Sequence, residues 1–163
     1  MNEPATIVLA DYQDPRHQAA IPALLDEYAR DPMGGGEALE AGVLARLVGE
    51  LARRPGAFTV LAFVADEPVG LVNCFEGFST FRARPLVNIH DVVVREPFRG
   101  RGVSTLMLER VEAEARARGC CKLTLEVLSN NTVAKVAYQR FGFADYQLDP
   151  EAGIALFWQK ALA

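Results

Sequence analysis

The sequence has few cysteines and histidines and no long apolar run. Its three cysteines, two of them adjacent, form no even disulfide framework, so we expect free thiols in a reducing compartment and a cytoplasmic protein. The two histidines lie far apart, and no Cys/His cluster has metal-ligand spacing, so we expect no metal. The first residues lack the basic and apolar regions of a signal peptide, and the apolar runs fall well short of the ~20 residues that cross a bilayer. We therefore expect no membrane partner.

Charged residues are also sparse, at 23% of 163 residues, whereas half of the residues are apolar. This balance is typical of a single globular domain, which we place over residues 1–163. The net charge of −4 argues against nucleic acid as a partner, because proteins that bind it are usually basic. Mild acidity is compatible with a cationic amine substrate, although it is also common in cytosolic proteins.

A basic, glycine-containing loop lies between the β-branched run Val92–Val94 and an amphipathic helix that begins at Val103. The loop contains Arg99, Gly100, Arg101 and Gly102. The first N–H groups of a helix have no intrahelical acceptor, and the helix dipole places partial positive charge there. Glycine lets the backbone approach a ligand closely, and the arginines add full charges. The pattern predicts a pyrophosphate site.

Several phosphate-binding motifs can be compared with this loop. A P-loop needs a lysine that the loop lacks, and the dinucleotide fingerprint needs a third glycine where Thr105 stands. Arg99–Ser104 does match the pattern Q/R-x-x-G-x-G/A, with serine in the final small position. It resembles the acetyl-CoA loop of the GNAT acetyltransferase superfamily. An ordinary glycine turn between a strand and a helix would explain the loop equally well.

A second motif follows downstream. Lys122–Val127 has the alternation of a strand, and capping residues then introduce a short helix that ends at a glycine. This segment resembles the superfamily block N-x-x-A-x-x-x-Y-x-x-x-G-F, in Asn131, Ala134, Tyr138, Gly142 and Phe143. The two motifs occur in the right order, joined by one helix and one strand. The sequence is therefore identified as a member of the GNAT superfamily.

A third resemblance concerns Gly77–Pro85 and the strand Asn88–Val94. Together they resemble the diamine (spermidine/spermine, thialysine) acetyltransferase branch, which has an F-S-T-F-x-A-x-P-like segment before a strand reading L-E-D-x-x-V. His90 stands where that branch has glutamate. The likeness runs from about Phe58 to the C-terminus.

The resemblance implies acetyl-CoA as the acetyl donor. The loop would hold its diphosphate, and backbone groups near the end of the preceding strand would hold the pantetheine arm and face the thioester carbonyl. Asn131 would contact the cofactor and could also cap its helix. The candidate cofactor-binding residues are Val92, Val93, Val94, Arg99, Gly100, Arg101, Gly102, Val103, Ser104 and Asn131.

Two side chains are candidates for catalysis. Tyr138 stands at the superfamily's general-acid position, and a phenol is protonated at neutral pH; otherwise it is a core tyrosine on an apolar helix face. His90 is the candidate base, because imidazole accepts a proton near neutral pH, and a structural histidine is the alternative. Side chains alternate along a strand, so Asp91 would face away from His90 unless a bulge intervenes.

Apolar periodicity and turn residues predict the element order β-α-α-β-β-β-α-β-α-β-β. The first helix starts at Asp14–Pro15, and Pro22 is expected to split or delay it. The last strand is expected at Ile154–Trp158. The fold class is α/β (α+β): a GNAT-like mixed, mostly antiparallel sheet of six to seven strands with helices on both faces.

The leading hypothesis is an acetyl-CoA-dependent N-acetyltransferase. It would transfer an acetyl group to a primary amine of a small molecule by direct attack in a ternary complex. A protein or peptide N-acetyltransferase with an open acceptor groove is one alternative, and a non-catalytic acyl-CoA-binding sensor is another. The resemblance also suggests a homodimer.

Overall fold

The computed structural model describes residues 3–162. The chain forms two compact units, the first ending at Leu128 and the second beginning at Ser129. Each unit is described by itself below.

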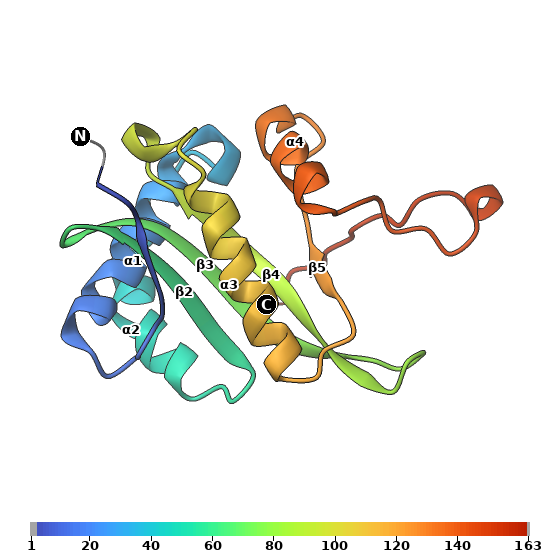
Figure 1. Ribbon diagram of the computed structural model, residues 1–163, viewed down its shortest axis with the longest axis horizontal. Helices are drawn as coiled ribbons and strands as arrows, with labels where there is room; N and C mark the ends of the chain where they lie inside the picture. Colours follow the sequence, from blue (N-terminus) through green and yellow to red (C-terminus); the bar gives the residue numbers. More distant parts are fainter. Residues whose placement is uncertain (1–2, 163) are drawn as a thin grey trace. The chain divides into compact units, whose positions relative to one another are not determined.

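The first unit is built on a five-stranded sheet in the order β1-β2-β3-β4-β5 (Figure 1). The first four strands pair antiparallel, and β5 pairs parallel to β4. The predicted mixed, mostly antiparallel α/β fold is confirmed. The strands are β1 (Thr6–Leu9), β2 (Ala57–Val64), β3 (Glu67–Ser79), β4 (Arg84–Val94) and β5 (Leu123–Leu125).

Helices cover both faces of this sheet (Figure 1). On one face α1 (Pro15–Arg30) and α2 (Ala41–Ala52) form an apolar core with alternate residues of β2, β3 and β4. On the other face α3 (Val103–Ala117) packs across β1 to β4. A Cβ at Gly70 of β3 would lie 2.9 Å from the sulfur of Met107, so glycine there lets α3 approach closely.

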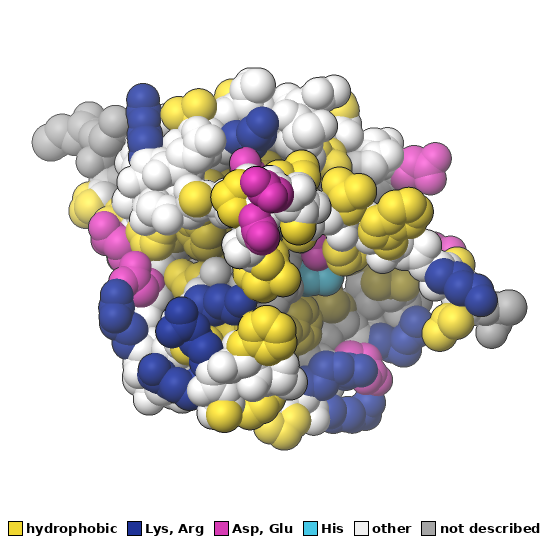
Figure 2. Space-filling model, turned by 90° about the vertical axis from the view of Figure 1, so that its right-hand side faces the viewer, with side chains coloured by type: hydrophobic (Ala, Val, Ile, Leu, Met, Phe, Trp, Pro, Cys, Tyr) yellow, Lys and Arg dark blue, Asp and Glu magenta, His cyan; other side chains and the backbone are white. Residues whose placement is uncertain are grey.

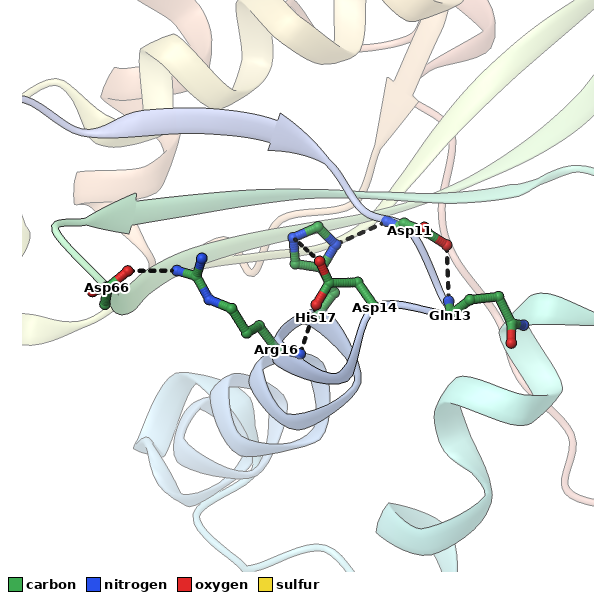
Figure 3. A network of polar contacts seen from close by, with 6 residues as sticks. All are labelled: Asp11, Gln13, Asp14, Arg16, His17 and Asp66. Atoms are coloured by element: carbon green, nitrogen blue, oxygen red, sulfur yellow. Dashed lines mark hydrogen bonds and ion pairs between the residues drawn. The ribbon is translucent and has the colours of Figure 1, made fainter.

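Polar contacts hold the start of α1 in place (Figure 3). As predicted, Asp14 is the N-cap, and its Oδ1 accepts the Arg16 N–H at 2.8 Å. His17 Nδ1 accepts the Asp11 N–H at 2.9 Å, and its Nε2 lies 3.9 Å from Asp14 Oδ2. Arg16 also pairs with Asp66, in the turn between β2 and β3, at 3.0 Å. His17 is therefore part of the structural cap.

The first helix continues through Pro22, so the expectation that this proline splits or delays it is wrong. Proline inside a helix removes one N–H donor and costs about 3 kcal/mol. Ile21 and Leu24, on either side of it, pack against the sheet and are 0% and 2% exposed. Burial of each side chain contributes about 1.5–3 kcal/mol, which offsets the proline.

The first unit also contains two short 3₁₀ helices. One is η1 (Pro32–Gly34), directly after α1, and the other is η2 (Glu96–Phe98), directly after β4. The β3–β4 hairpin carries the segment Gly77–Pro85 around its turn, where Phe81 is 86% exposed. Within this segment, which resembles the diamine branch, Gly77–Ser79 and Arg84–Pro85 belong to the two strands, and residues 80–83 form the turn.

The second unit contains α4 (Thr132–Phe141) and η3 (Pro150–Ala152). Asn131 caps α4 as predicted, with its Oδ1 accepting the Ala134 N–H at 3.2 Å. The helix ends at Gly142, whose φ of 110° lies in the left-handed region that glycine favours.

The predicted order has two strands after α4, the last of them at Ile154–Trp158, and neither is formed in the part of the chain that the structure describes. The sheet therefore has five strands rather than six to seven. Ala155 N–H donates to the Tyr146 carbonyl at 3.4 Å, but no ladder follows. A strand needs a neighbour for its backbone groups, which apolar alternation alone does not supply. Hydrophobic side chains are visible on the surface in Figure 2. In the segment Ile154–Trp158, the exposed hydrophobic side chains include Ile154, Leu156, Phe157 and Trp158.

Candidate active site

The loop from Arg99 to Gly102 joins η2 to α3 with two left-handed glycines. Gly100 has a φ of +74° and Gly102 a φ of +78°. No atom lies within 4 Å of a Cβ built at either position. The backbone conformation, rather than crowding by neighbours, therefore requires glycine here.

The N-terminus of α3 presents free backbone donors. Its N-cap is Gly102, which has no side chain to accept a hydrogen bond. Among the described residues, no acceptor binds the N–H groups of Val103, Ser104 or Thr105; the first N–H to find one is that of Leu106, bonded to the Gly102 carbonyl at 3.1 Å. Three unpaired amides at the positive end of a helix dipole favour an anion.

The two arginines of the loop have different surroundings. Arg101 is exposed, with its guanidinium carbon 5.2 Å from the centre of the Phe98 ring. Arg99 Nε donates to the Val94 carbonyl at 2.9 Å, and its Nη2 lies 3.3 Å from Asp31 Oδ2. The Met33 N–H and Arg99 together lower the pKa of Asp31. Arg99 thus links the end of β4 to the segment that follows α1.

One edge of β4 is unpaired next to this loop. The shorter strand β5 pairs with β4 only from Val87 to Ile89. From His90 to Val94, no strand of the described chain pairs with this edge of β4. The other edge is paired with β3 up to Val94. The backbone of Val92–Val94 can therefore bond a ligand on the open side.

A β-bulge at His90 changes the direction of its neighbours. Asn73 of β3 pairs with Asp91, but the next residue, Cys74, pairs with Ile89, so His90 is an extra residue in β4. Val93 lies in the core beneath α1 and α2. Asp91 is two residues before it in the strand and therefore faces the same side of the sheet as Val93. The His90 ring meets the Phe75 ring edge-on, with the centroids 5.4 Å apart.

Phe75 also packs against that core, so His90 and Asp91 share the α1/α2 face of the sheet. The sequence predicted that Asp91 would face away from His90 unless a bulge intervened. The bulge is present, so the two side chains lie on the same face. A bulge breaks the two-residue alternation on which that expectation depends.

Buried polar side chains continue inward from Asp91. Asn73, which is 2% exposed, donates from Nδ2 to Asp91 Oδ2 at 3.0 Å. Thr59, which is 0% exposed, donates to Asn73 Oδ1 at 2.7 Å, and the Tyr12 hydroxyl lies 2.9 Å from Thr59 Oγ1. Burial raises the pKa of Tyr12, so its hydroxyl stays protonated. Thr59 and Asn73 are polar residues within otherwise apolar strands, and this pattern was the available sequence signal for the buried hydrogen bonds, which were not predicted.

The predicted site residues fall in both units. The first unit brings together His90, the end of β4 and the loop that leads into α3. The second unit holds Asn131 and Tyr138. Tyr138 is half-buried on α4, and its ring lies edge-on to Phe143 with centroids 6.0 Å apart.

Among the residues that the structure describes, no group of three or more His, Cys, Asp or Glu side chains could hold a metal ion. None of the helices over residues 3–162 is long and apolar enough to span a membrane.

Comparison with known proteins gives the family. The model of the acetyltransferase (GNAT) family matches residues 21–143, which include the bulge, the glycine loop and α4. The chain belongs to this family. An uncharacterised N-acetyltransferase of Methanocaldococcus jannaschii is 33% identical over 86 residues, which are 52% of this chain and 38% of that protein. The GNAT chain thus spans little more than a third of the length of the curated relatives it matches.

Solved structures agree on the fold of this GNAT chain. A probable acetyltransferase has a TM-score of 0.77 at 20% identity, with 97% of each chain covered. An aminoglycoside N-acetyltransferase in complex with CoA has a TM-score of 0.75 at 15% identity, covering 99% of this chain and 98% of that one. At such identities these structures establish the fold alone.

Proposed function

We propose that the protein is an acetyl-CoA-dependent N-acetyltransferase that acts on a primary amine of a small molecule. The observation that carries this proposal is the row of unpaired amides at the start of α3, next to the open edge of β4. Diphosphate suits such a helix terminus, and an extended amide-containing arm suits a strand edge with free backbone groups. The family match supports the same donor.

The residues present fit acetyl-CoA, which supplies the acetyl group as a thioester. The N–H groups of Val103 and Ser104, together with the backbone at Gly100–Gly102, would bind the diphosphate. Arg99 and Arg101 would add positive charge beside it. The backbone of Val92, Val93 and Val94 would orient the pantetheine arm, and Asn131 would add a further contact.

Two side chains would move the protons. His90 would accept a proton from the acceptor ammonium, directly or through water, which leaves a neutral amine. The amine nitrogen then forms a bond to the acetyl carbon while the carbon–sulfur bond breaks. Tyr138 would give its hydroxyl proton to the departing sulfur, so the products are an amide and a thiol.

A small-molecule acceptor is supported by the likeness of Gly77–Pro85 and Asn88–Val94 to the diamine branch. Small-molecule acceptors also occur among relatives of the fold, since one similar structure is an aminoglycoside N-acetyltransferase.

We propose in addition a single domain over residues 1–163, a homodimer and a cytoplasmic location, without a metal, nucleic acid or membrane partner.

A thiol-release assay with amines, aminoglycosides, amino acids and peptides tests this function. We expect release with a small primary amine. In Tyr138→Phe, kcat should fall by about 100-fold or more, as is typical for loss of a general acid, while the Kd for acetyl-CoA stays within about twofold. Unchanged kcat would remove Tyr138 from the mechanism. Acetyl-CoA binding without thiol release from any acceptor would instead favour the sensor.

A further inference from the structure

The guanidinium of Arg99 is bound to groups that lie outside the glycine loop. Its Nε donates to the Val94 carbonyl at 2.9 Å, and its Nη2 lies 3.3 Å from Asp31 Oδ2. Nε and Nη2 form the edge with which an arginine binds an oxyanion through two parallel hydrogen bonds. Because both nitrogens are occupied, this edge of Arg99 does not face a diphosphate at the start of α3.

Asp31 is itself fixed by the backbone around it. It is the C-cap of α1 and the N-cap of η1, and its Oδ1 accepts the Met33 N–H at 2.9 Å. Its backbone carbonyl accepts the N–H groups of Gly34 at 2.8 Å and Gly36 at 3.1 Å. The Arg99 side chain is long and 55% exposed. Arg99 is therefore the partner in this ion pair that can change position.

A second ion pair joins the same two segments without Arg99. Arg95 and Arg99 are the N-cap and C-cap of η2, and Arg95 Nε lies 2.9 Å from Glu27 Oε2. Glu27 lies one helical turn before Asp31. The end of α1 therefore stays attached to η2 when Arg99 leaves Asp31, and the fold does not depend on the Arg99–Asp31 pair.

An anion at the start of α3 would compete with Asp31 for Arg99. Arg99 lies three residues before Gly102, the N-cap of α3, and the first three N–H groups of α3 have no acceptor among the described residues. A diphosphate bound there would carry more negative charge than one carboxylate, and the helix terminus would hold it in place. The exchange costs little, because an exposed ion pair such as Arg99–Asp31 contributes little to stability.

We propose that Asp31 is a positioning residue that holds Arg99 away from the diphosphate site, and that Arg99 exchanges Asp31 for the diphosphate when acetyl-CoA binds. This inference rests on the proposed function and identifies a carboxylate that lowers the affinity for the acetyl donor. It also links the donor site to the segment after α1. By thermodynamic reciprocity, donor binding weakens the hold of Arg99 on Asp31 by the same factor by which Asp31 weakens donor binding.

Calorimetric titration of acetyl-CoA into the full chain and its variants tests the proposal. Asp31→Asn removes the charge but keeps an oxygen that can accept the Met33 N–H, since asparagine is a good N-cap. We expect it to bind acetyl-CoA about two- to fivefold more tightly than the wild type, as for release from an exposed ion pair. Asp31→Ser, which also keeps a capping oxygen, should show the same gain and replaces Asp31→Asn if that variant does not fold.

A matched control removes a charge that is not paired with Arg99. Glu96 is exposed, lies three residues before Arg99 and forms no ion pair with any described residue. Glu96→Gln should leave the Kd for acetyl-CoA unchanged, because physiological salt screens charges that are not in contact. An equal gain in Glu96→Gln and Asp31→Asn would overturn the proposal.

The same substitution in an Arg99→Gln background separates competition from direct repulsion. Without Arg99, Asp31→Asn should no longer tighten binding. A gain that persists there would mean that Asp31 repels the anion directly, and this result would also overturn the proposal.

The titrations also distinguish this inference from the proposed function. Wild-type protein that does not bind acetyl-CoA would overturn both. Binding that Asp31→Asn does not tighten would overturn the inference alone. Tighter binding in Asp31→Asn without thiol release from any acceptor would support the inference and reject only the proposed transfer.

Discussion

Replacement of Gly102 by alanine, compared with the same change at Gly119, separates the cost of a strained backbone from the loss of the proposed phosphate site. Gly102 has a φ of +78°, where an L-residue costs about 1–2 kcal/mol, and no atom lies within 4 Å of the added Cβ. Gly119, after the last turn of the same helix, has a φ of +72° and equally open surroundings. The two substitutions should therefore lower the free energy of unfolding by the same amount. For a chain of this size that corresponds to a fall in Tm of roughly 2–8 °C.

Cofactor binding should distinguish the two variants. At a concentration of about 100 times its Kd, acetyl-CoA stabilises the native state by ~2.7 kcal/mol, which raises Tm by roughly 5–11 °C. In Gly102→Ala the new methyl group stands beside the unpaired amides of α3, and we expect binding to weaken at least about tenfold. The stabilisation at the same concentration then falls to ~1.4 kcal/mol, about half. In Gly119→Ala it should be unchanged.

Thermal denaturation with and without acetyl-CoA, supported by calorimetric titration, measures both effects. Equal ligand-induced shifts in Gly102→Ala and Gly119→Ala would refute the placement of the diphosphate at the start of α3. The same conclusion would follow if millimolar acetyl-CoA gave no shift in the wild type.

Two further predictions concern the interior of the sheet. Thr59→Val should lower the free energy of unfolding by about 1–3 kcal/mol in urea denaturation, because it leaves the buried Asn73 oxygen without its donor, whereas the exposed Thr80→Val should have little effect. An equal loss in both variants would contradict the role of the polar chain. Burial raises the pKa of the Cys74 thiol, so folding keeps it protonated while the unfolded chain ionises near pH 8.5. Stability is therefore retained below that pH and should fall by ~1 kcal/mol between about pH 8.5 and 9.5, and a decline of equal size in Cys74→Val would refute this cause.

Local signals predicted much of the fold. Asp14 caps α1, the glycine loop leads into α3 at Val103, and Asn131 and Gly142 bound α4, all as expected. Each of these features depends on residues within a few positions along the chain, because caps and turns satisfy neighbouring backbone groups. The candidate residues around the loop could be named for the same reason.

Other predictions failed where distant parts of the chain decide the outcome. Pro22 does not interrupt α1, because burial of the residues around it outweighs the lost hydrogen bond. The strand at Ile154–Trp158 is absent, because its apolar residues have no neighbouring strand in the described chain. Propensity favours an element, but packing and pairing determine whether it forms.

By itself, the sequence determined the family, the position of the glycine loop before α3 and the helix caps, since each is encoded in a short, contiguous pattern. Only the tertiary structure decided that His90 is an extra residue in β4 and that Asp91 shares its face. That bulge depends on the register between β3 and β4, and the hydrogen bond from Asn73 to Asp91 joins residues 18 positions apart. A shift of one residue reverses the face of every side chain in a strand, and no local pattern specifies it.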